Sequence, residues 1–525
     1  MSHPINRREF IEATGAAAVM STCHGALART PADRPNLLVI HTDEQNFRTL
    51  GCYRNLMPED RALMWGSTVC ETPNIDWLAD NGAVATRFYA TTPVCSPSRG
   101  AFLTGRYPQN NGVVTNGGTL LDDTITFGEV LRKSGYATGY AGKWHVDNKG
   151  SNNLWAPERK FGFTDNRYML HHGHWKQLED TPEGPRVIDY EKISVDGATP
   201  RNYSTDFLAD KTVDFINEHK DEPFCYMLSI PDPHGPNLVR APYDTMYTDK
   251  LKAPATMNKS TEDLPWWGQP HEVLKRGFDS DLLAQYFGMV KCIDDNVGKI
   301  LTAVRKAGLI DKTIILFTSD HGDMCYEHGR INKSIPFEAS AKVPFVLYNP
   351  SQIDSGTVVN EALGCVDFMP TILGLMGVKS AGTEEGRNAA ELFTDKTPAD
   401  WNDIAIFRSS GTGAGWLAAA TKRHKLVVTS DSSPWLFDME KDPHELENFF
   451  ADPASREVVR SLSAQLLAYG ATHKDPRIQL SRVKADLTWC AEGTGAYVPS
   501  EPDNNQPKVR TKRKPKKKRN TRQKD

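Results

Sequence analysis

The chain of 525 residues contains no apolar run of the roughly 20 residues that a membrane-spanning helix needs, so no membrane span is expected. Cysteine is also scarce: the nine cysteines include no Cys-x-x-Cys pair. This argues against a structural zinc site and against a small scaffold held by disulfides. One disulfide, for example between Cys52 and Cys70, is compatible with the sequence but not implied by it.

The net charge at pH 7 is only −4, but the charge is unevenly distributed. Residues 508–525 contain 11 Lys or Arg and one Asp, a net charge of +10, which leaves −14 for the rest of the chain. An acidic body argues against nucleic acid as a partner. We expect the Pro- and Lys-rich residues 499–525 to form a disordered tail. Whether this tail is simply solvated or contacts an acidic polysaccharide or anionic surface stays open.

The first 28 residues resemble an export signal. Paired arginines precede Phe within residues 6–10, a short apolar stretch covers residues 13–20, and Ala-Leu-Ala occupies residues 26–28. A charged region, an apolar region and a small-x-small site in this order are typical of a signal peptide, and the paired arginines favour the twin-arginine type. This predicts a periplasmic or secreted protein. The alternative is an ordinary disordered terminus.

Between about residues 34 and 350, short β-branched runs alternate with amphipathic helical stretches. Buried strands are expected at 37–40, 224–230 and 313–318, and apolar residues at helical spacing predict a helix over 282–304. Strands separated by helices favour an α/β fold with a large, mostly parallel or mixed sheet and helices on both faces.

The pattern changes from about residue 400 onward. Short alternating runs at 416–418, 425–429 and 435–437 predict a small antiparallel sheet, and residues 455–469 predict a helix that packs on it. We therefore expect a C-terminal α+β subdomain over residues 400–490.

Two long segments, roughly 148–200 and 237–279, carry many His and Trp residues without a clear period, among them His172, His174 and Trp266. Long segments between core elements are often surface loops with binding functions. Packing of these rings onto the body explains most of them equally well.

Polar residues follow four of the predicted strands. In an open parallel sheet, ligands bind beyond the carboxyl ends of the strands, so we expect these side chains to surround one crevice. One such residue alone could be structural, because an Asp after a strand often caps a helix. The residues are Asp43 and Glu44, Lys143 and His145, His234, and Asp320 and His321.

The segment Cys95-Ser-Pro-Ser-Arg99 predicts a helix N-terminus. Pro97 suits the first turn, Ser96 suits the cap and Gly105 suits the end of the helix. The backbone N–H groups at such an end favour an anion, and Arg99 follows one turn later on the same side as Cys95. The spacing alone predicts an anion-binding site.

These segments resemble the signatures of type I sulfatases, members of the alkaline phosphatase superfamily. The first signature is similar to Cys95-Ser-Pro-Ser-Arg99 with Thr104-Gly105, and the second to the segment from Gly135 to His145. The resemblance spans about residues 34–450 and implies an alkaline-phosphatase-like catalytic domain over residues 34–395. Further matches occur in the expected order: Pro233-His234-Gly-Pro236, Thr318-Ser-Asp320-His321-Gly322, Lys333 within Asn332–Glu338, and Leu436–Glu445.

The resemblance implies that a maturation enzyme, the formylglycine-generating enzyme, oxidises Cys95 to formylglycine. One hydroxyl of the hydrated aldehyde attacks sulfur, and the second then expels sulfate, which an ordinary serine cannot do. The resemblance also implies a divalent metal, and hard carboxylate ligands favour calcium, with magnesium less favoured. Its implied ligands are Asp43, Glu44, Cys95, Asp320 and His321.

Two of these ligands leave alternatives open. Glu44 stands where the family usually has Asp, so it either binds the metal or orients Asp43. His321 is either a ligand or a neutral hydrogen-bond donor beside the metal.

By the same resemblance, Arg99, Lys143 and Lys333 place positive charge around the sulfate, the main electrostatic contribution to catalysis. His145 is the candidate that takes the proton as the intermediate collapses, and His234 the candidate that protonates the departing alcohol. Glu327 and His328 also follow a metal-bearing strand. They either support the ligands or contact substrate.

The implied function is hydrolysis of sulfate esters. Two alternatives are a phosphate or phosphonate ester hydrolase on the same scaffold and a non-catalytic protein that binds sulfated glycans. The export signal and the aromatic loops favour a sulfated carbohydrate as substrate, while small aryl or choline sulfates stay open. The sequence does not determine the oligomeric state.

Overall fold

The computed structural model describes residues 34–147, 159–182, 184–188, 192–259, 264–270, 277–394 and 401–500. The predicted signal peptide (1–28) and nearly all of the predicted basic tail (499–525) lie outside these ranges. From Pro35 onward the described chain belongs to one compact unit. None of the helices in the described ranges combines the length and the apolar character that a membrane span requires.

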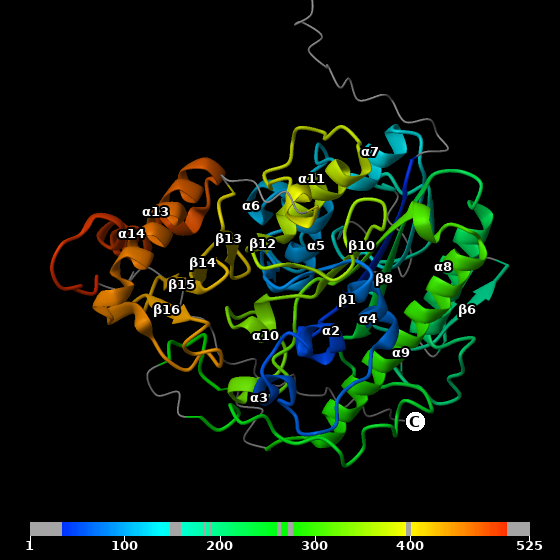
Figure 1. The fold of residues 1–525 in the computed structure, drawn as a ribbon, viewed down its shortest axis with the longest axis horizontal. Coiled ribbons are helices and arrows are strands. Elements are labelled where there is room, and N and C mark those ends of the chain that lie inside the picture. Colours follow the sequence, from blue (N-terminus) through cyan, green and yellow to red (C-terminus); the bar gives the residue numbers. More distant parts are fainter. Residues whose placement is uncertain are drawn as a thin grey trace, which may run out of the picture. The chain divides into compact units, whose positions relative to one another are not determined.

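An eight-stranded sheet forms the centre of this unit, with strand order β11-β2-β10-β9-β1-β8-β4-β5 (Figure 1). Only β10 runs antiparallel to its neighbours β2 and β9, and every other neighbouring pair is parallel. The predicted mixed, mostly parallel sheet is confirmed. The strands are β1 (Asn36–Asp43), β2 (Ala83–Ala85), β4 (Ala137–Lys143), β5 (Asp165–Leu170), β8 (Phe224–Pro233), β9 (Thr313–Ser319), β10 (Phe345–Tyr348) and β11 (Thr357–Val359).

Both faces of the sheet are covered by helices. In β1, Leu37 and Val39 belong to one apolar core, and Leu38 and Ile40 to the other. A continuous apolar run is what a strand buried on both faces requires. The first core contains residues of α5 (Cys95–Thr104), α7 (Phe127–Lys133) and α11 (Cys365–Met376), and the second those of α4 (Pro73–Asp80), α8 (Ser204–Glu218) and α9 (Ser280–Lys306).

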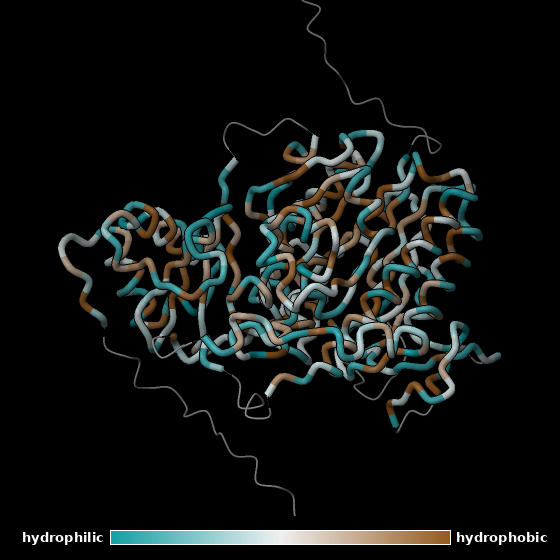
Figure 2. Tube along the Cα trace, turned by 60° about the horizontal axis from the view of Figure 1, so that its bottom comes forward, coloured by the Kyte–Doolittle hydropathy of each residue, from teal (hydrophilic) through white to brown (hydrophobic). Residues whose placement is uncertain are grey.

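Helix α9 extends the predicted helix by two residues at each end, and Asp279 caps it by accepting a hydrogen bond from the Leu282 backbone (3.0 Å). The tube in Figure 2 alternates between hydrophobic and hydrophilic stretches along the chain, as expected for amphipathic elements packed on one face. The short elements are α2 (Gly51–Arg54), α3 (Glu59–Ala62), α6 (Pro108–Asn111), α10 (Glu338–Ala341), α12 (Ala390–Phe393), η2 (Phe47–Thr49), β3 (Phe88–Tyr89), β6 (Leu178–Thr181), β7 (Gly184–Val187) and β12 (Leu363–Gly364).

The predicted small sheet is also present. Its four antiparallel strands are β13 (Ala405–Arg408), β14 (Trp416–Ala420), β15 (His424–Thr429) and β16 (Trp435–Asp438). The predicted helix is α13 (Arg456–His473), and a second helix, α14 (Ser481–Glu492), was not predicted. Between residues 395 and 400, where the predicted boundary falls, the chain lies outside the described ranges.

The two faces of the small sheet pack differently. Leu417 and Val428 face the helices α13 and α14, whereas Trp416 and Phe437 pack against Phe337 of the main body. The Trp416 indole also donates a hydrogen bond to the carbonyl of Ser334 (3.2 Å). The small sheet therefore supports the segment that immediately follows Lys333.

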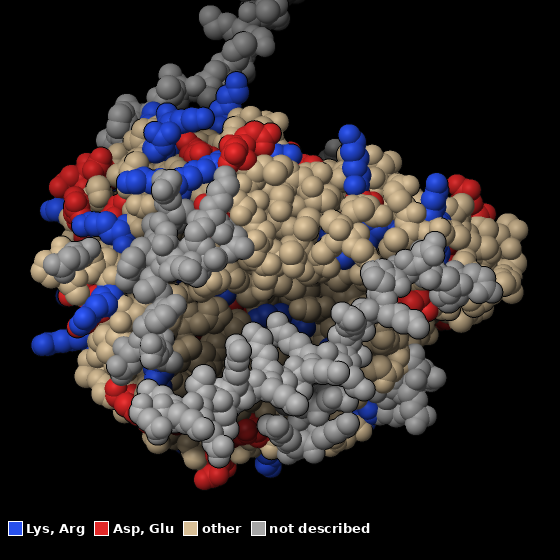
Figure 3. All heavy atoms as spheres, turned by 180° about the vertical axis from the view of Figure 1, so that it is seen from behind, with Lys and Arg blue, Asp and Glu red and all other residues tan. Residues whose placement is uncertain are grey.

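The described surface mixes both signs of charge. On the face seen in Figure 3, Lys and Arg are interspersed with Asp and Glu. Among the described residues all eight cysteines are free and buried, so Cys52 and Cys70 do not form the disulfide that the sequence left open.

Candidate active site

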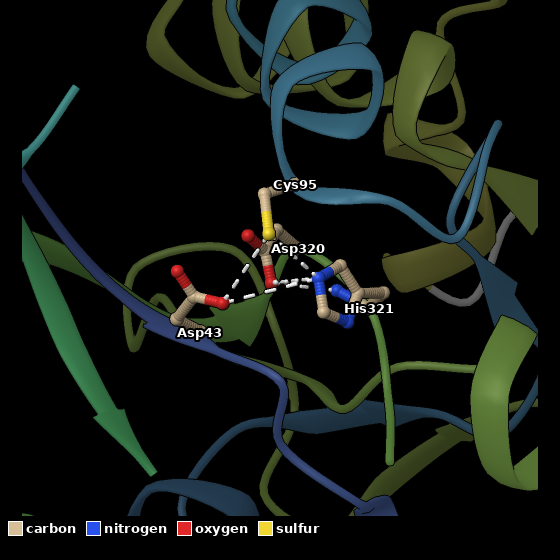
Figure 4. Close-up of side chains that lie close together, drawn as sticks. All are labelled: Asp43, Cys95, Asp320 and His321. Atoms are coloured by element: carbon tan, nitrogen blue, oxygen red, sulfur yellow. Dashed lines mark hydrogen bonds and ion pairs between the residues drawn. The ribbon is translucent and has the colours of Figure 1, made fainter. Parts of the chain in front are cut away.

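Four side chains from three separate segments meet at the carboxyl edge of the main sheet (Figure 4). Asp43 ends β1, Asp320 and His321 directly follow β9, and Cys95 begins α5. One ligand atom from each lies within 4.8 Å of all the others, and all four residues are buried. The Cys95 Sγ is 3.2 Å from His321 Nε2 and 3.7 Å from Asp43 Oδ1.

Helix α5 places Cys95 in its first turn. The cap is the extended Val94, which makes no side-chain bond, so the prediction of Ser96 as the cap was wrong. Ser96 is itself helical, and its backbone N–H donates to Asn116 Oδ1 (3.0 Å). Gly105 ends the helix at φ +63°, as predicted, because this left-handed conformation favours glycine.

Arg99 ties the ends of the neighbouring strands together. Its Nε lies 2.9 Å from Asp320 Oδ2, and its Nη2 lies 3.2 Å from Asp43 Oδ2. Its Nη1 donates to Ser229 Oγ (2.7 Å) and to the Lys143 carbonyl (3.0 Å). Burial alone would lower the pKa of Arg99, but Asp320 and Asp43 raise it, so this buried guanidinium stays charged.

Lys143, the last residue of β4, pairs with Asp43 through a short contact between Nζ and Oδ2. Burial opposes ionisation of Asp43, yet Lys143 and other cations hold its pKa well below the usual range. Lys143 Nζ also lies 2.8 Å from His174 Nε2, and His174 Nδ1 lies 3.2 Å from the Gly235 carbonyl. The imidazole therefore donates through Nδ1 and accepts the Lys143 proton at Nε2.

His174 was not assigned a role from the sequence, although it stood out in a His-rich loop. No local pattern could place it, because it follows β5, a strand that the sequence did not predict.

Glu44 lies beside Asp43 and links two further predicted residues. Its Oε2 accepts from Lys333 Nζ (2.7 Å) and lies 3.1 Å from His234 Nε2. Its Oε1 is buried and has no hydrogen-bond partner among the described residues. Burial raises the pKa of Glu44 well above its usual range, while Lys333 opposes this.

His145 adopts a left-handed backbone conformation, φ +62°, which is uncommon outside glycine and concentrates at functional sites. Its Nδ1 is buried without a hydrogen-bond partner among the described residues. Burial, together with Lys143 and Arg99, lowers the pKa of His145 far below its usual value. The side chain is therefore a neutral imidazole.

The donor atoms fit a hard divalent cation. His321 Nδ1 lies 3.0 Å from the Gly322 carbonyl and donates to it, so the unprotonated Nε2, 3.2 Å from Cys95 Sγ, has a lone pair that a metal could use. Carboxylate oxygens of Asp43 and Asp320 lie beside it, and the unpartnered Oε1 of Glu44 belongs to the adjacent residue. An oxygen-rich set of this kind suits calcium or magnesium.

Glu327 and His328 lie outside this group. Glu327 pairs with Arg48 at 2.9 Å, and His328 stacks on Phe337 with ring centroids 4.0 Å apart. Both side chains are buried, and their contacts are with neighbouring structural residues. The geometry favours a packing role for both.

His328 predicts a measurable pH dependence of stability. Burial lowers its pKa to about 3, against about 6.5 in the unfolded chain, so the unfolded state binds the proton first as pH falls. Its stabilising contribution is present above pH ~6.5 and is lost as pH falls from there towards 3. For His328→Gln, the loss of unfolding free energy between pH 7 and pH 5 should be smaller by about 2 kcal/mol.

Urea unfolding at the two pH values measures this difference. The exposed variant Asn217→Ala, which removes no titratable group, serves as the control and should keep the wild-type dependence. An unchanged dependence in His328→Gln would contradict the prediction.

Comparison with known proteins identifies the family of this chain. The family model for sulfatases matches residues 35–378, and a model for the C-terminal part of N-sulphoglucosamine sulphohydrolase matches residues 326–472. The first match alone covers most of the chain. The protein belongs to the sulfatase family. It is thus a sulfuric ester hydrolase.

Relatives of this sulfatase are similar over most of its length. An N-acetylglucosamine-6-O-sulfatase of Bacteroides thetaiotaomicron is 27% identical over 499 residues, covering 79% of this chain and 83% of the relative. A solved structure in complex with its substrate D-glucosamine-2-N,6-O-disulfate has a TM-score of 0.69 at 22% identity, covering 84% of this chain and 98% of that one.

The fold is shared with other esterases. A phosphonate monoester hydrolase of Agrobacterium radiobacter has a TM-score of 0.66 at 23% identity, covering 85% of this chain and 97% of that one. At this identity the likeness concerns the fold alone. The fold of the sulfatase is therefore alkaline-phosphatase-like, as the sequence predicted.

Proposed function

We propose that this sulfatase hydrolyses sulfate esters of carbohydrates outside the cytoplasm, with Cys95 converted to formylglycine and calcium as the metal. The main support is the meeting of Cys95 with Asp43, Asp320 and His321 in one buried group. The carbohydrate is suggested by the relative named N-acetylglucosamine-6-O-sulfatase and by the solved complex with a sulfated glucosamine.

The proposed metal ligands are Asp43, Asp320, His321 and the group at position 95, with Glu44 as an additional ligand through its unpartnered oxygen. When bound, a hard cation lowers the pKa of a hydroxyl on the hydrated formylglycine, which then serves as the nucleophile. Arg99 holds Asp43 and Asp320 in place through its two ion pairs.

Lys143 and Lys333 are proposed to stabilise the negative charge of the bound sulfate and the negative charge that develops in the transition state of its transfer. Both are buried or nearly so, and each is held by a carboxylate of the ligand group: Lys143 by Asp43 and Lys333 by Glu44. A buried ammonium acts strongly because little water screens it.

His145 is proposed as the base that takes the proton when sulfate is expelled. Burial, Lys143 and Arg99 lower its pKa in the free protein, and the negative charge of a bound sulfate would raise it towards the range in which the ring can accept a proton. His234 is proposed to protonate the leaving alcohol. Burial and the nearby Lys143 and Lys333 lower the pKa of His234 to about 2, although Asp43 opposes this.

In the free protein His234 is therefore a neutral imidazole. Its Nδ1 lies 2.6 Å from the Gly235 carbonyl and donates to it, and its Nε2 faces Glu44 Oε2 at 3.1 Å. A bound sulfate ester adds negative charge near the ring and raises its pKa towards the range in which it can donate a proton.

Mass and rate measurements on one sample test the reaction. In protein from a host with a formylglycine-generating enzyme, the peptide containing Cys95 should be lighter by roughly 18 Da, the change from thiol to aldehyde. The same sample should turn over an aryl sulfate faster than an aryl phosphate or phosphonate. An unmodified thiol in active protein, or a dominant phosphonate rate, would overturn the proposal.

The substrate class has its own test. Initial rates across a panel of sulfated mono- and oligosaccharides, with choline sulfate and an aryl sulfate as references, should give the highest kcat/KM for a sugar. Activity on the small sulfates but on none of the sugars would be consistent with sulfate-ester hydrolysis and would exclude a carbohydrate as the substrate class.

We also propose that residues 1–28 direct export and are removed. N-terminal sequencing of protein recovered from the periplasm or medium should find the mature chain beginning just after Ala28. A full-length chain retained in the cytoplasm would contradict this.

Replacing Glu44 with Gln should weaken calcium binding by about 10- to 100-fold, because a carboxyl group that can ionise when the cation binds becomes a neutral amide. The readout is the calcium concentration needed to raise the unfolding temperature of chelator-treated protein. Glu222→Gln, at an exposed carboxylate, is the matched control. If Glu44→Gln binds calcium like wild type, Glu44 only positions Lys333 and His234.

A further inference from the structure

A cationic cavity lies near β2 and the edge strand β11, apart from the Cys95 group. Its volume is about 330 Å³, and three positive side chains line it: Arg61 of α3, Arg87 at the start of β3, and Lys342 at the end of α10. No Asp or Glu lines it among the described residues. The neutral lining residues are Tyr53, Leu56, Met57, Thr86, Val358 and Asn360.

The carboxylates near these cations lie outside the cavity lining. Glu338 is shared, since its Oε2 lies 3.0 Å from Lys342 Nζ and 3.3 Å from Arg87 Nη1 while its Oε1 accepts from Lys425 Nζ (3.0 Å). Asp60 acts on Arg61 and Asp403 on Arg87 from farther away. None of these carboxylates lines the cavity, whose described charged lining residues are all cations.

Arg61 is the cation without a partner. Its guanidinium makes no hydrogen bond or ion pair with any residue that the structure describes, and its Nε is buried. Burial and the charge of Arg48 lower the pKa of Arg61, although Asp60 opposes this. Burial, with Arg87 and Arg48, also lowers the pKa of Lys342 to about 7 despite its pairing with Glu338. Three basic side chains therefore line one cavity in which no described carboxylate takes part.

We propose that this cavity binds a small doubly charged oxyanion, such as inorganic sulfate or phosphate. Guanidinium groups offer paired N–H donors that match tetrahedral oxyanions, and an ammonium adds a compact charge. Asn360 Oδ1 accepts from Thr86 Oγ1 (2.9 Å), which leaves the Asn360 amide nitrogen as a further donor. The site is non-catalytic and does not depend on the proposed substrate or on formylglycine.

The cavity adjoins the loop that follows the metal-binding strand. Lys342 Nζ lies 3.9 Å from the centre of the Phe47 ring, and the Arg48 guanidinium lies 4.6 Å from the same ring. Phe47 comes three residues after Glu44. An anion in this cavity therefore lies behind the active-site loop, apart from the Cys95 group itself.

Diffraction from crystals grown without sulfate or phosphate and soaked in selenate tests the site directly. An anomalous peak is expected among Arg61, Arg87 and Lys342 in wild-type protein and in the exposed-arginine control Arg132→Gln. The peak should disappear in Arg61→Gln. The proposal is overturned if the wild type shows no peak. It is also overturned if Arg61→Gln and a second variant, Lys342→Met, both keep a peak as strong as that of the wild type.

Calorimetric titration of the holoenzyme with sodium sulfate and, separately, sodium phosphate distinguishes the source of the anion. Arg61→Gln should weaken one binding event by about tenfold or more, because a charged hydrogen-bonding partner is lost. Inhibition of sulfate-ester hydrolysis by the same anion, which reports the active site, should be unchanged. If neither anion shows a binding event that depends on Arg61, the proposal fails.

Discussion

Replacement of Cys95 by serine should lower kcat for an aryl sulfate by on the order of 10³-fold or more, the scale seen when a catalytic nucleophile is removed. Serine has nearly the same size and would occupy the same buried first turn of α5, so the fold should be retained. It would, however, provide a single hydroxyl, and the proposed second hydroxyl that expels sulfate would be missing.

The matched control is Cys365→Ser, a second buried cysteine that begins α11 and whose Sγ lies 3.5 Å from Ser98 Oγ. It should retain activity close to that of the wild type. Calcium should still raise the unfolding temperature of Cys95→Ser, because Asp43 and Asp320 remain. A Cys95→Ser enzyme that turns over at the wild-type rate would exclude position 95 as the source of the nucleophile.

Replacement of Arg99 by methionine should have the largest effect on stability, a loss of about 3–5 kcal/mol of unfolding free energy in chelator-treated protein. The two carboxylates that Arg99 pairs with, Asp43 and Asp320, are fully buried, and removing the guanidinium leaves their charge uncompensated. Lys143 still pairs with Asp43, but Asp320 keeps no other basic Lys or Arg partner among the described residues.

Urea unfolding with and without calcium measures this effect. Calcium should recover part of the loss, since a cation bound by the same carboxylates replaces the missing charge. Arg186→Met, which breaks the exposed pair with Glu179, is the control and should cost about 0–1 kcal/mol. If Arg99→Met unfolds like wild type without calcium, the two carboxylates are not both ionised in the folded protein.

Calcium should also not restore activity to Arg99→Met. Arg99 holds the ends of β1 and β9 in register through Asp43 and Asp320 and also binds Ser229 of β8. Without it, the ligand group loses its alignment even when the metal charge is present. A variant that regains full kcat in calcium would limit Arg99 to a role in stability.

The local pattern of the chain was enough to predict much of the fold. The apolar runs at β1, β8 and β9 are buried on both faces of the sheet. Such runs can be recognised in the sequence without knowing which strand pairs with which. Helix α9 was equally clear, because a long stripe of apolar residues repeats along it. Strand β5 was missed because it is an edge strand with mostly polar, partly exposed residues.

By itself, the sequence determined which polar residues end the strands and which cysteine begins a helix, because both follow from local side-chain pattern. Only the tertiary structure decided that Glu44 contacts Lys333, 289 positions away, and that His174 holds Lys143. It also decided that Glu327 and His328 pack against structural neighbours and that Arg61, Arg87 and Lys342 line one cavity. Such contacts join residues far apart in the chain, and their distances depend on strand order and loop path, which no local pattern encodes.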